Sequence, residues 1–136
     1  MKKQFVLLMA VFCLLSLITN AQQTRLKDPQ RIYQKKTFTL LNPGETIPIY
    51  KREVFIGGKG FQTEIQYYFS KDSSTEILPL TLLNLKTAFT DNPSFQEWLD
   101  IYFHSDSELL RYDHYEKIYF LNKVYLISKN NPIKTN

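Results

Sequence analysis

Both histidines of the chain lie in one polar stretch, residues 104–117, with the sequence HSDSELLRYDHYEK. Imidazole nitrogens and carboxylate oxygens bind metal ions, and they also transfer protons near neutral pH. One interpretation is therefore a small metal-assisted hydrolase with ligands drawn from His104, Asp106, Glu108 and His114. Against it, the H-E-x-x-H spacing of metalloproteases is absent, and a stable zinc site needs three or four converging ligands. We therefore keep this hydrolase as the alternative function.

The same polar residues are typical of helix starts. A Ser, Thr, Asp or Asn at the N-cap with Glu three residues later satisfies two backbone amide donors, and the cap contributes about 1 kcal/mol. The spacing occurs in three pairs, each followed by apolar residues: Ser94 with Glu97, Ser105 with Glu108, and Asp113 with Glu116. We predict that these pairs begin successive helices. On this interpretation His104 ends the preceding helix, where a cation is favoured, and His114 is a surface residue.

No other motif indicates catalysis. No serine lies in a G-x-S-x-G elbow. The glycine-rich residues 57–60 lack the full phosphate-loop spacing, and Phe61 stands where that loop needs a hydroxyl side chain. A hairpin turn is the better interpretation of this segment. We therefore predict no catalytic residue and no cofactor.

Turn chemistry divides residues 31–69 into an antiparallel meander of about three strands. In residues 42–45, Asn-Pro-Gly-Glu, proline fixes φ at the second position and glycine supplies the positive φ that a type II turn needs at the third. Residues 57–60, Gly-Gly-Lys-Gly, predict the second turn. Both turns indicate hairpins.

The middle strand has an irregular apolar pattern. Ile47 and Ile49 share one parity along it. Val54 and Ile56 share the other, so one unbroken strand cannot direct all four side chains to the same face. We predict a bulge or a break of the strand near residues 50–52, either of which would restore the register.

The third strand is predicted from strict alternation over residues 61–69. Phe61, Thr63, Ile65, Tyr67 and Phe69 alternate with Gln62, Glu64, Gln66 and Tyr68. The first set is expected in the core and the second set in solvent. Tyr68 then places an aromatic ring beside Gln66 and Glu64, which can hold a glycan or a peptide. The competing possibility is that another element covers Tyr68, and an open sheet edge offers strand addition from a partner as a further route.

The apolar periodicity becomes helical after residue 75. One helix is indicated by Leu78, Leu82, Leu85 and Phe89, and the next by Phe95, Trp98, Leu99 and Tyr102. Strands first and helices afterwards are typical of an α+β domain. We predict one domain over residues 31–130, with three or four short α-helices within residues 78–127 packed on one face of the small sheet, and a tail over residues 131–136.

Residues 1–21 are predicted to be a secretory signal peptide. Lys2 and Lys3 precede an apolar run, residues 5–18, and small or polar residues follow up to Ala21. The run falls short of the about 20 residues that span a bilayer, so we expect no stable membrane span after cleavage. Cleavage removes Cys13, the only cysteine, so the exported chain forms no disulfide and has no catalytic thiol. A polar leader over residues 22–30 follows, and residence is expected in the periplasm or outside the cell.

The charge of the exported chain is nearly balanced. Without Lys2 and Lys3, the 17 basic side chains fall to 15, against 13 acidic ones, for a net charge of +2. Basic pairs remain at residues 35–36 and 51–52, with acidic residues in the same regions. Nucleic-acid binding needs a concentrated positive face, so no nucleic-acid partner is predicted. The expected partner is an envelope or extracellular protein, a peptide or a glycan.

Residues 67–89, YYFSKDSSTEILPLTLLNLKTAF, and residues 105–119, SDSELLRYDHYEKIY, resemble small exported proteins of unknown function from Bacteroidetes-type bacteria. The resemblance implies residence in the envelope or outside the cell, and it implies no reaction. We therefore predict an exported, non-catalytic binding or protein-interaction module. The metal-assisted hydrolase is the alternative, and an exported inhibitor of another protein is a third possibility.

Overall fold

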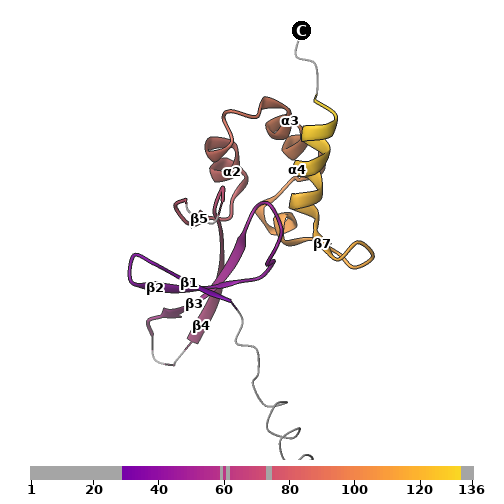
Figure 1. Cartoon of the computed structure of the whole chain (residues 1–136). Coiled ribbons are helices and arrows are strands. Elements are labelled where there is room, and N and C mark those ends of the chain that lie inside the picture. The colour runs from indigo at the N-terminus through magenta and orange to yellow at the C-terminus, as the bar shows by residue number, and fades with distance from the viewer. Residues whose placement is uncertain (1–28, 59, 61, 73–74, 133–136) are drawn as a thin grey trace, which may run out of the picture.

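A computed structural model of the chain describes residues 29–58, 60, 62–72 and 75–132. Within these ranges the chain forms a five-stranded antiparallel sheet, three α-helices and a separate two-stranded sheet (Figure 1). The α+β class is confirmed, but the main sheet has five strands rather than three. Its strands, in spatial and chain order, are β1 Gln30–Tyr33, β2 Lys36–Leu40, β3 Ile49–Ile56, β4 Gln62–Phe69 and β5 Leu78–Pro79. The other elements are α2 Leu82–Ala88, α3 Pro93–Tyr102, the short 3₁₀ helix η1 Asp106–Leu110, β6 Tyr112–Asp113, β7 Ile118–Tyr119 and α4 Phe120–Asn130.

The predicted signal peptide, residues 1–21, and residues 22–28 of the predicted leader lie outside the described residues. Gln30, which was placed at the end of that leader, is the first residue of β1. Among the described residues, no helix has the length and apolar character needed to cross a membrane.

The first two strands are joined by a two-residue turn that the sequence analysis did not predict. Tyr33 pairs with Lys36, and between them Gln34 and Lys35 have φ of 48° and 61°. Two successive positive φ values are typical of a type I′ turn, whose twist matches that of a hairpin. Such turns usually carry Asn or Gly, because other residues lose about 1–2 kcal/mol in the left-handed region. The first predicted strand of the meander is therefore two strands, β1 and β2.

The predicted turn at residues 42–45 is confirmed. Gly44 has a φ of 89°, and Glu45 N donates to Asn42 O at 3.2 Å. The buried side chain of Asn42, the first residue of the turn, also bonds the backbone that follows. Its Nδ2 donates to Ile47 O at 2.8 Å, and its Oδ1 accepts from Ile49 N at 2.6 Å. These bonds connect the turn to the first residue of β3.

The predicted bulge or break in β3 is wrong. The pairing of β3 with β4 is continuous, from Ile49 opposite Phe69 to Ile56 opposite Gln62. Ile49 and Tyr50 point to opposite faces and are both buried, because this end of the sheet has apolar clusters on both sides. At the other end of β3, Ile56 is exposed. The change of parity therefore reflects different surroundings along one regular strand.

The larger cluster joins the sheet to the helices. Ile49 and Phe69, which are cross-strand partners, pack in it with residues of α2, α3 and α4. The residues of this cluster are Ile47, Ile49, Phe69, Leu80, Leu85, Phe89, Phe95, Leu99, Phe103, Leu109, Leu121 and Val124. A smaller cluster on the other face contains Phe38, Tyr50 and Ile77. Burial on both faces holds this end of the sheet in place.

The first predicted helix begins later than expected. Leu78 lies in β5, opposite Phe69, and not in a helix. The helix α2 begins at Leu82, where the Thr81 side chain caps it by accepting from Asn84 N at 3.1 Å. Pro79 explains part of the difference, because proline is tolerated in an edge strand but disfavours a helix interior.

The second predicted helix is confirmed as α3, with Phe95 and Leu99 fully buried. Its predicted start, the Ser94 and Glu97 pair, is wrong. The N-cap is Asn92, whose Oδ1 accepts from Phe95 N at 3.1 Å, and Pro93 occupies the first turn. Proline is favoured there because its missing N–H has no partner inside the helix.

Candidate functional site

Side chains of residues 104–108 form hydrogen bonds to backbone amides near the ends of neighbouring helices. The Asp106 Oδ1 accepts from Leu82 N, at the start of α2, at 2.8 Å. The Glu108 Oε2 accepts from His104 N at 3.0 Å, one residue before the N-cap, whereas a capping box would bond the amide of the N-cap itself. Ser105 is the N-cap of η1, but its hydroxyl is bonded to Ser107 Oγ rather than to a backbone amide. Ser105 therefore begins a helical element as predicted, but neither bond of the predicted capping box forms, and the element is a short 3₁₀ helix.

Asp113 organises a turn rather than a helix start. Its Oδ1 accepts from Tyr115 N at 3.0 Å and from Glu116 N at 3.1 Å, within the hairpin of β6 and β7. Lys123 of α4 lies 3.1 Å from Asp113 Oδ2 and 2.9 Å from Glu116 Oε1. The backbone amide of Glu116 and the Lys123 ammonium lower the pKa of Asp113. One of the two predicted capping bonds forms, from Glu116 N to Asp113 Oδ1, but the predicted helix there is wrong, because α4 begins only at Phe120.

The four candidate metal ligands have separate surroundings. The exposed His104 ring lies just after α3, with its Nδ1 3.7 Å from Glu108 Oε2. His114 lies in the turn between β6 and β7, exposed and edge-on to the Tyr112 ring at 5.1 Å. Asp106 is bonded to α2, as described above. Within residues 29–132 as far as they are described, no group of three or more His, Cys, Asp or Glu side chains is placed to share a metal ion.

The predicted binding residues of β4 share one face of the sheet. The Tyr68 hydroxyl donates to Gln66 Oε1 at 2.8 Å. The Tyr68 ring is half-buried and packs edge-on against Phe38 of β2 at 5.0 Å. Glu64 is exposed and lies opposite Val54. The ring of Tyr68 is thus partly covered by β2, while Gln66 and Glu64 extend along the strand away from the helices.

One depression, of about 430 Å³, lies between α4 and the connection that joins α2 to α3. Its polar groups are bonded to one another. Lys71 Nζ is 2.8 Å from Asp91 Oδ1 and lowers the pKa of that carboxyl, and Asn92 Nδ2 donates to Ser128 Oγ at 3.4 Å. The Lys129 ammonium lies over the Tyr125 ring. These internal partners leave few groups for a ligand.

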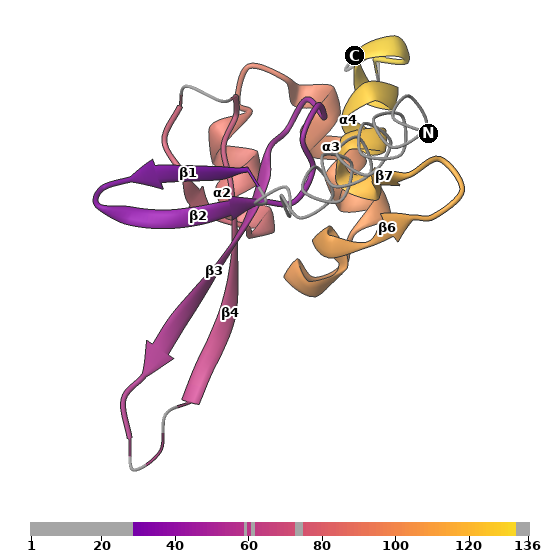
Figure 2. The same ribbon diagram turned by 60° about the horizontal axis from the view of Figure 1, so that its bottom comes forward.

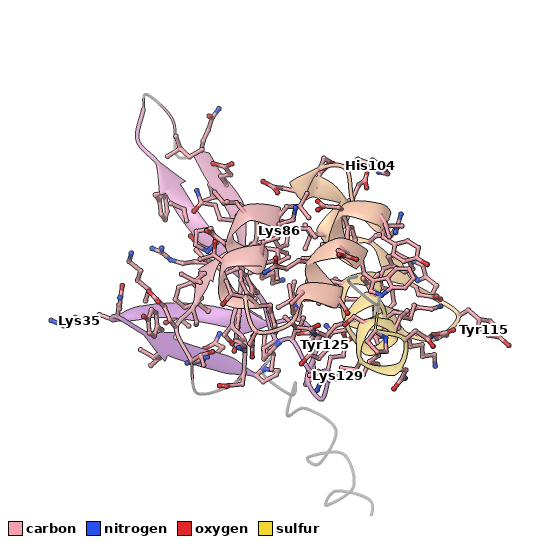
Figure 3. All side chains as sticks on the ribbon, turned by 90° about the horizontal axis from the view of Figure 1, so that it is seen from above. Lys35, Lys86, His104, Tyr115, Tyr125 and Lys129 are labelled. Carbon is pink, nitrogen blue, oxygen red and sulfur yellow. The ribbon has the colours of Figure 1, made fainter. Side chains whose placement is uncertain are left out.

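A second depression lies between the two hairpins of the main sheet. β2 and β3 pair at only two positions, Thr39 with Lys51 and Leu40 with Tyr50. Figure 2 shows the β1–β2 and β3–β4 hairpins spreading apart from this point. The space between them is an open pocket of about 500 Å³, which we call the wedge. Figure 3 shows Lys35, at the tip of the β1–β2 hairpin, far from Tyr125 and Lys129 of the other depression.

The β3 wall of the wedge is a strand edge with backbone groups directed into it. Leu41 N donates to Ile49 O at 2.8 Å, so Ile49 directs its backbone groups toward β2. This direction alternates along a strand, so Glu53 and Phe55 share it. Beyond the two β2–β3 pairs, no described strand lies against this edge of β3. The N–H and C=O groups of Glu53 and Phe55 therefore face the open wedge.

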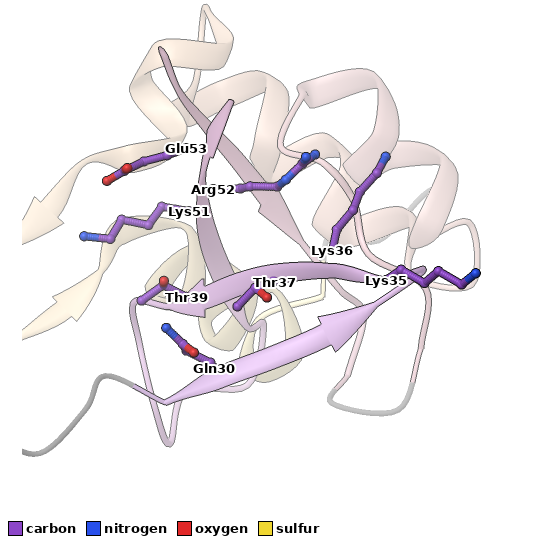
Figure 4. Close-up of a pocket in the computed structure, with 8 residues that line it drawn as sticks. All are labelled: Gln30, Lys35, Lys36, Thr37, Thr39, Lys51, Arg52 and Glu53. Atoms are coloured by element: carbon purple, nitrogen blue, oxygen red, sulfur yellow. The ribbon is translucent and has the colours of Figure 1, made fainter. Parts of the chain in front are cut away.

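Basic side chains project from the walls of the wedge on both faces of the sheet. Figure 4 shows Lys51 beside Glu53 on one side of β3, and Arg52 with Lys36 directed to the other side. The Arg52 guanidinium lies 5.9 Å from the centre of the Phe38 ring, which helps to hold it in place. Lys35 extends outward at the hairpin tip.

These basic residues differ from Lys71, Lys86 and Lys123 in lacking an acidic partner. Ion pairs elsewhere join Lys71 to Asp91, Lys86 to Asp100, and Lys123 to Asp113 and Glu116. In the described part of the chain, no carboxylate lies within 4.0 Å of the basic groups of Lys35, Lys36, Lys51 or Arg52. The lining of the wedge, with these four basic residues and Glu53, therefore carries a net positive charge without close ion pairs.

Beyond the wedge the β3–β4 hairpin extends away from the helices as a two-stranded arm. We define this hairpin arm as residues 53–56 of β3 and residues 62–65 of β4. Phe55 is 72% exposed and Ile65 is 48% exposed. Phe55 pairs with Thr63 and Glu53 pairs with Ile65, so the two apolar side chains are diagonal neighbours on one face. The arm thus presents an apolar surface outside the core.

The sequence analysis did not identify the wedge or the arm. The basic pairs at residues 35–36 and 51–52 could be identified in the sequence. That both pairs line one pocket could not be predicted, because they are distant in the sequence. Phe55 was assigned no role. The parity change along β3 was the available signal, because it marks the point where the strand leaves the core.

Comparison with known proteins supplies no relative. No family model matches the chain, and no curated protein and no solved structure matches it.

Proposed function

We propose that this protein is an exported, non-catalytic protein-interaction module, and that it binds its partner through the hairpin arm. Export is an inference from the signal-like residues 1–21. The absence of a catalytic motif in the sequence favours binding over reaction. Residence in the envelope or outside the cell follows from export.

The observation that carries this proposal is the exposure of Phe55 and Ile65 on one face of the arm. Scattered exposed apolar residues are common on protein surfaces, but adjacent ones on an extension beyond the core are typical of contact surfaces. Because Phe55 and Ile65 stay 72% and 48% exposed, folding removes only part of their apolar surface from water. Their burial against a partner would contribute about 25 cal/mol per Å² of apolar area.

The edges of the arm support the same function. On one side β2 leaves β3 after Lys51, and on the other side β5 pairs with β4 only at Tyr68 and Phe69. Among the described strands, none covers either edge farther along the arm. Exposed strand edges bind extended segments of other proteins by adding a strand.

Site-specific photocrosslinking tests this function. A benzophenone amino acid replaces Phe55 in one variant and Leu83 in a control, because Leu83 of α2 is equally exposed, at 74%, but lies outside the arm. We expect an envelope or secreted protein to crosslink at position 55 and not at position 83. Equal crosslinking at both positions would contradict the proposal.

The crosslinked protein is then purified and titrated with the exported chain. Phe55→Ser is expected to weaken its binding about tenfold, since it removes a large apolar contact, whereas Leu83→Ser leaves the affinity unchanged. Circular dichroism shows whether each variant remains folded. Unchanged affinity of a folded Phe55→Ser variant would also contradict the proposal.

A further inference from the structure

The wedge is an open pocket that combines a free strand edge with basic side chains, and these features indicate what kind of ligand it can bind. We propose that it binds an extended acidic peptide segment of a partner, which adds to the free edge of β3 as an antiparallel strand. This rests on the proposed interaction function and names the chemistry of the partner. The segment would run in the direction of β2 and take the place that β2 leaves empty beyond Thr39.

Backbone geometry supplies the first reason. The N–H and C=O groups of Glu53 and Phe55 point into the wedge, so a strand can exchange hydrogen bonds with both residues. Strand addition uses such bonds for affinity and uses alternate side chains for specificity. The pocket of about 500 Å³ between the hairpins provides room for the added segment.

Charge supplies the second reason. Arg52 and Lys36 project on one face of the sheet, and no carboxylate among the described residues pairs with either one. Opposite charges on facing positions of paired strands stabilise the pairing, and complementary charge also speeds association. Glu64 is on this face of the neighbouring strand β4, diagonal to Arg52, but the two side chains form no ion pair. An acidic side chain opposite Arg52 is therefore favoured.

The other face has a different character, and it defines a pattern for the peptide. Phe55 is exposed there, on the same side as Lys51 and Glu53. A peptide residue opposite Phe55 directs its side chain to this face, where an apolar group gains contact. Because facing residues in paired strands alternate, the peptide should alternate acidic residues toward Arg52 with apolar residues toward Phe55.

A synthetic probe tests this pattern. The probe is a fluorescein-labelled peptide of about eight residues, the length of an ordinary strand, with valine and glutamate in alternation. Fluorescence anisotropy with the exported chain should show saturable binding that weakens as salt is added. A peptide with lysine in place of glutamate should bind about tenfold more weakly. Equal affinity for the two peptides would overturn the proposal.

Backbone methylation provides the sharpest control. Residues opposite Glu53 and Phe55 direct their N–H groups toward β3, and these are the valines of the probe. N-methylation of the valines should abolish binding, whereas N-methylation of the glutamates should be tolerated because their N–H groups point away from β3. Binding that is insensitive to both modifications would exclude strand addition.

Protein variants locate the site and separate this inference from the function on which it rests. Arg52→Glu should weaken binding of the probe about tenfold, whereas Lys129→Glu, on α4, should leave it unchanged. A single-stranded oligonucleotide that bound more tightly than the acidic probe, with the same dependence on Arg52, would overturn the peptide assignment. Loss of probe binding with persistent crosslinking at position 55 would refute the acidic strand and leave the interaction function standing.

Discussion

The side-chain amide of Asn122 holds both backbone groups of Ile47. Its Oδ1 accepts from Ile47 N at 2.7 Å and its Nδ2 donates to Ile47 O at 3.0 Å. Both residues are buried, and they lie in α4 and in the connection between β2 and β3. A helix side chain thus supplies the bonds that a neighbouring strand would otherwise supply, and it joins the last helix to the sheet.

Removing this amide should destabilise the fold. Asn122→Ala leaves the N–H of Ile47 buried without its partner, and we expect a loss of about 2–3 kcal/mol in the free energy of unfolding. Urea denaturation measures the difference. Asn84→Ala is the control, because the Asn84 amide bonds Pro79 O at an exposed position and should cost about 0.5–1 kcal/mol. Equal losses for the two variants would show that the Asn122 bonds add no special stability.

A second prediction concerns the β1–β2 turn. Lys35→Gly should raise the free energy of unfolding by about 0.5–1 kcal/mol, because glycine adopts the φ of 61° without steric cost. Thermal denaturation would show a higher midpoint. Lys36→Gly, one residue later and within β2, should lower the midpoint. A lower midpoint for Lys35→Gly would contradict the type I′ assignment.

The third prediction concerns the contribution of Trp98 in α3 to the free energy of unfolding. The sequence analysis placed Trp98 and Leu99 together on the apolar face of a helix, but only Leu99 is fully buried. The half-buried Trp98 ring stacks on Tyr102 at 5.6 Å. Trp98→Ala should therefore cost about 1–2 kcal/mol, from lost ring stacking and partial burial, and Leu99→Ala about 2–5 kcal/mol. Chemical denaturation of both variants gives the order, and a larger loss for Trp98→Ala would show that the helix phase is wrong.

A fourth prediction follows from the pKa of Asp113, which is lowered from 3.8 by the Glu116 amide and by Lys123. A carboxyl with a lowered pKa in the folded state stabilises the fold above its ordinary pKa, and this contribution disappears as the pH falls through the folded value. The wild type should therefore be more stable than Asp113→Asn at pH 7, with the gap closing in strong acid. Urea midpoints across this pH range provide the measurement. A gap that is independent of pH would show that the charge of Asp113 adds no stability.

The fifth prediction concerns the hydrolase alternative. His104, Asp106, Glu108 and His114 do not gather into a group in the described structure, so saturating zinc, manganese or calcium should leave the melting temperature unchanged. Differential scanning fluorimetry with and without each ion checks this. A rise in melting temperature that His104→Ala removes would establish a metal site and favour the alternative.

The sequence predicted the structure correctly where the conformation of a segment depends only on residues within that segment. The Gly44 turn and the phase of α3 were predicted because proline, glycine and apolar spacing act within a few residues. The β1–β2 turn was missed, since Gln34 and Lys35 carry no signal for positive φ. The pairing of Leu78 with Phe69 was missed for a different reason, because a two-residue edge strand is defined by its partner.

The wedge and the hairpin arm could not be predicted from short segments of the sequence. Whether Phe55 is buried depends on how far β3 extends past the helices, and alternation along the strand is the same in either case. The convergence of Lys36 and Arg52 depends on where β2 separates from β3.

The amino-acid sequence by itself determined the α+β class, the net charge of +4, the absence of familiar catalytic motifs and the polar bonding groups of residues 104–117. Only the tertiary structure decided which turns and helix ends these polar groups bond, and that a wedge of net positive charge lies beside an exposed arm. The physical reason is that chain-local sterics and hydrogen bonds set turns and periodicity, whereas burial and charge pairing depend on which distant segments meet.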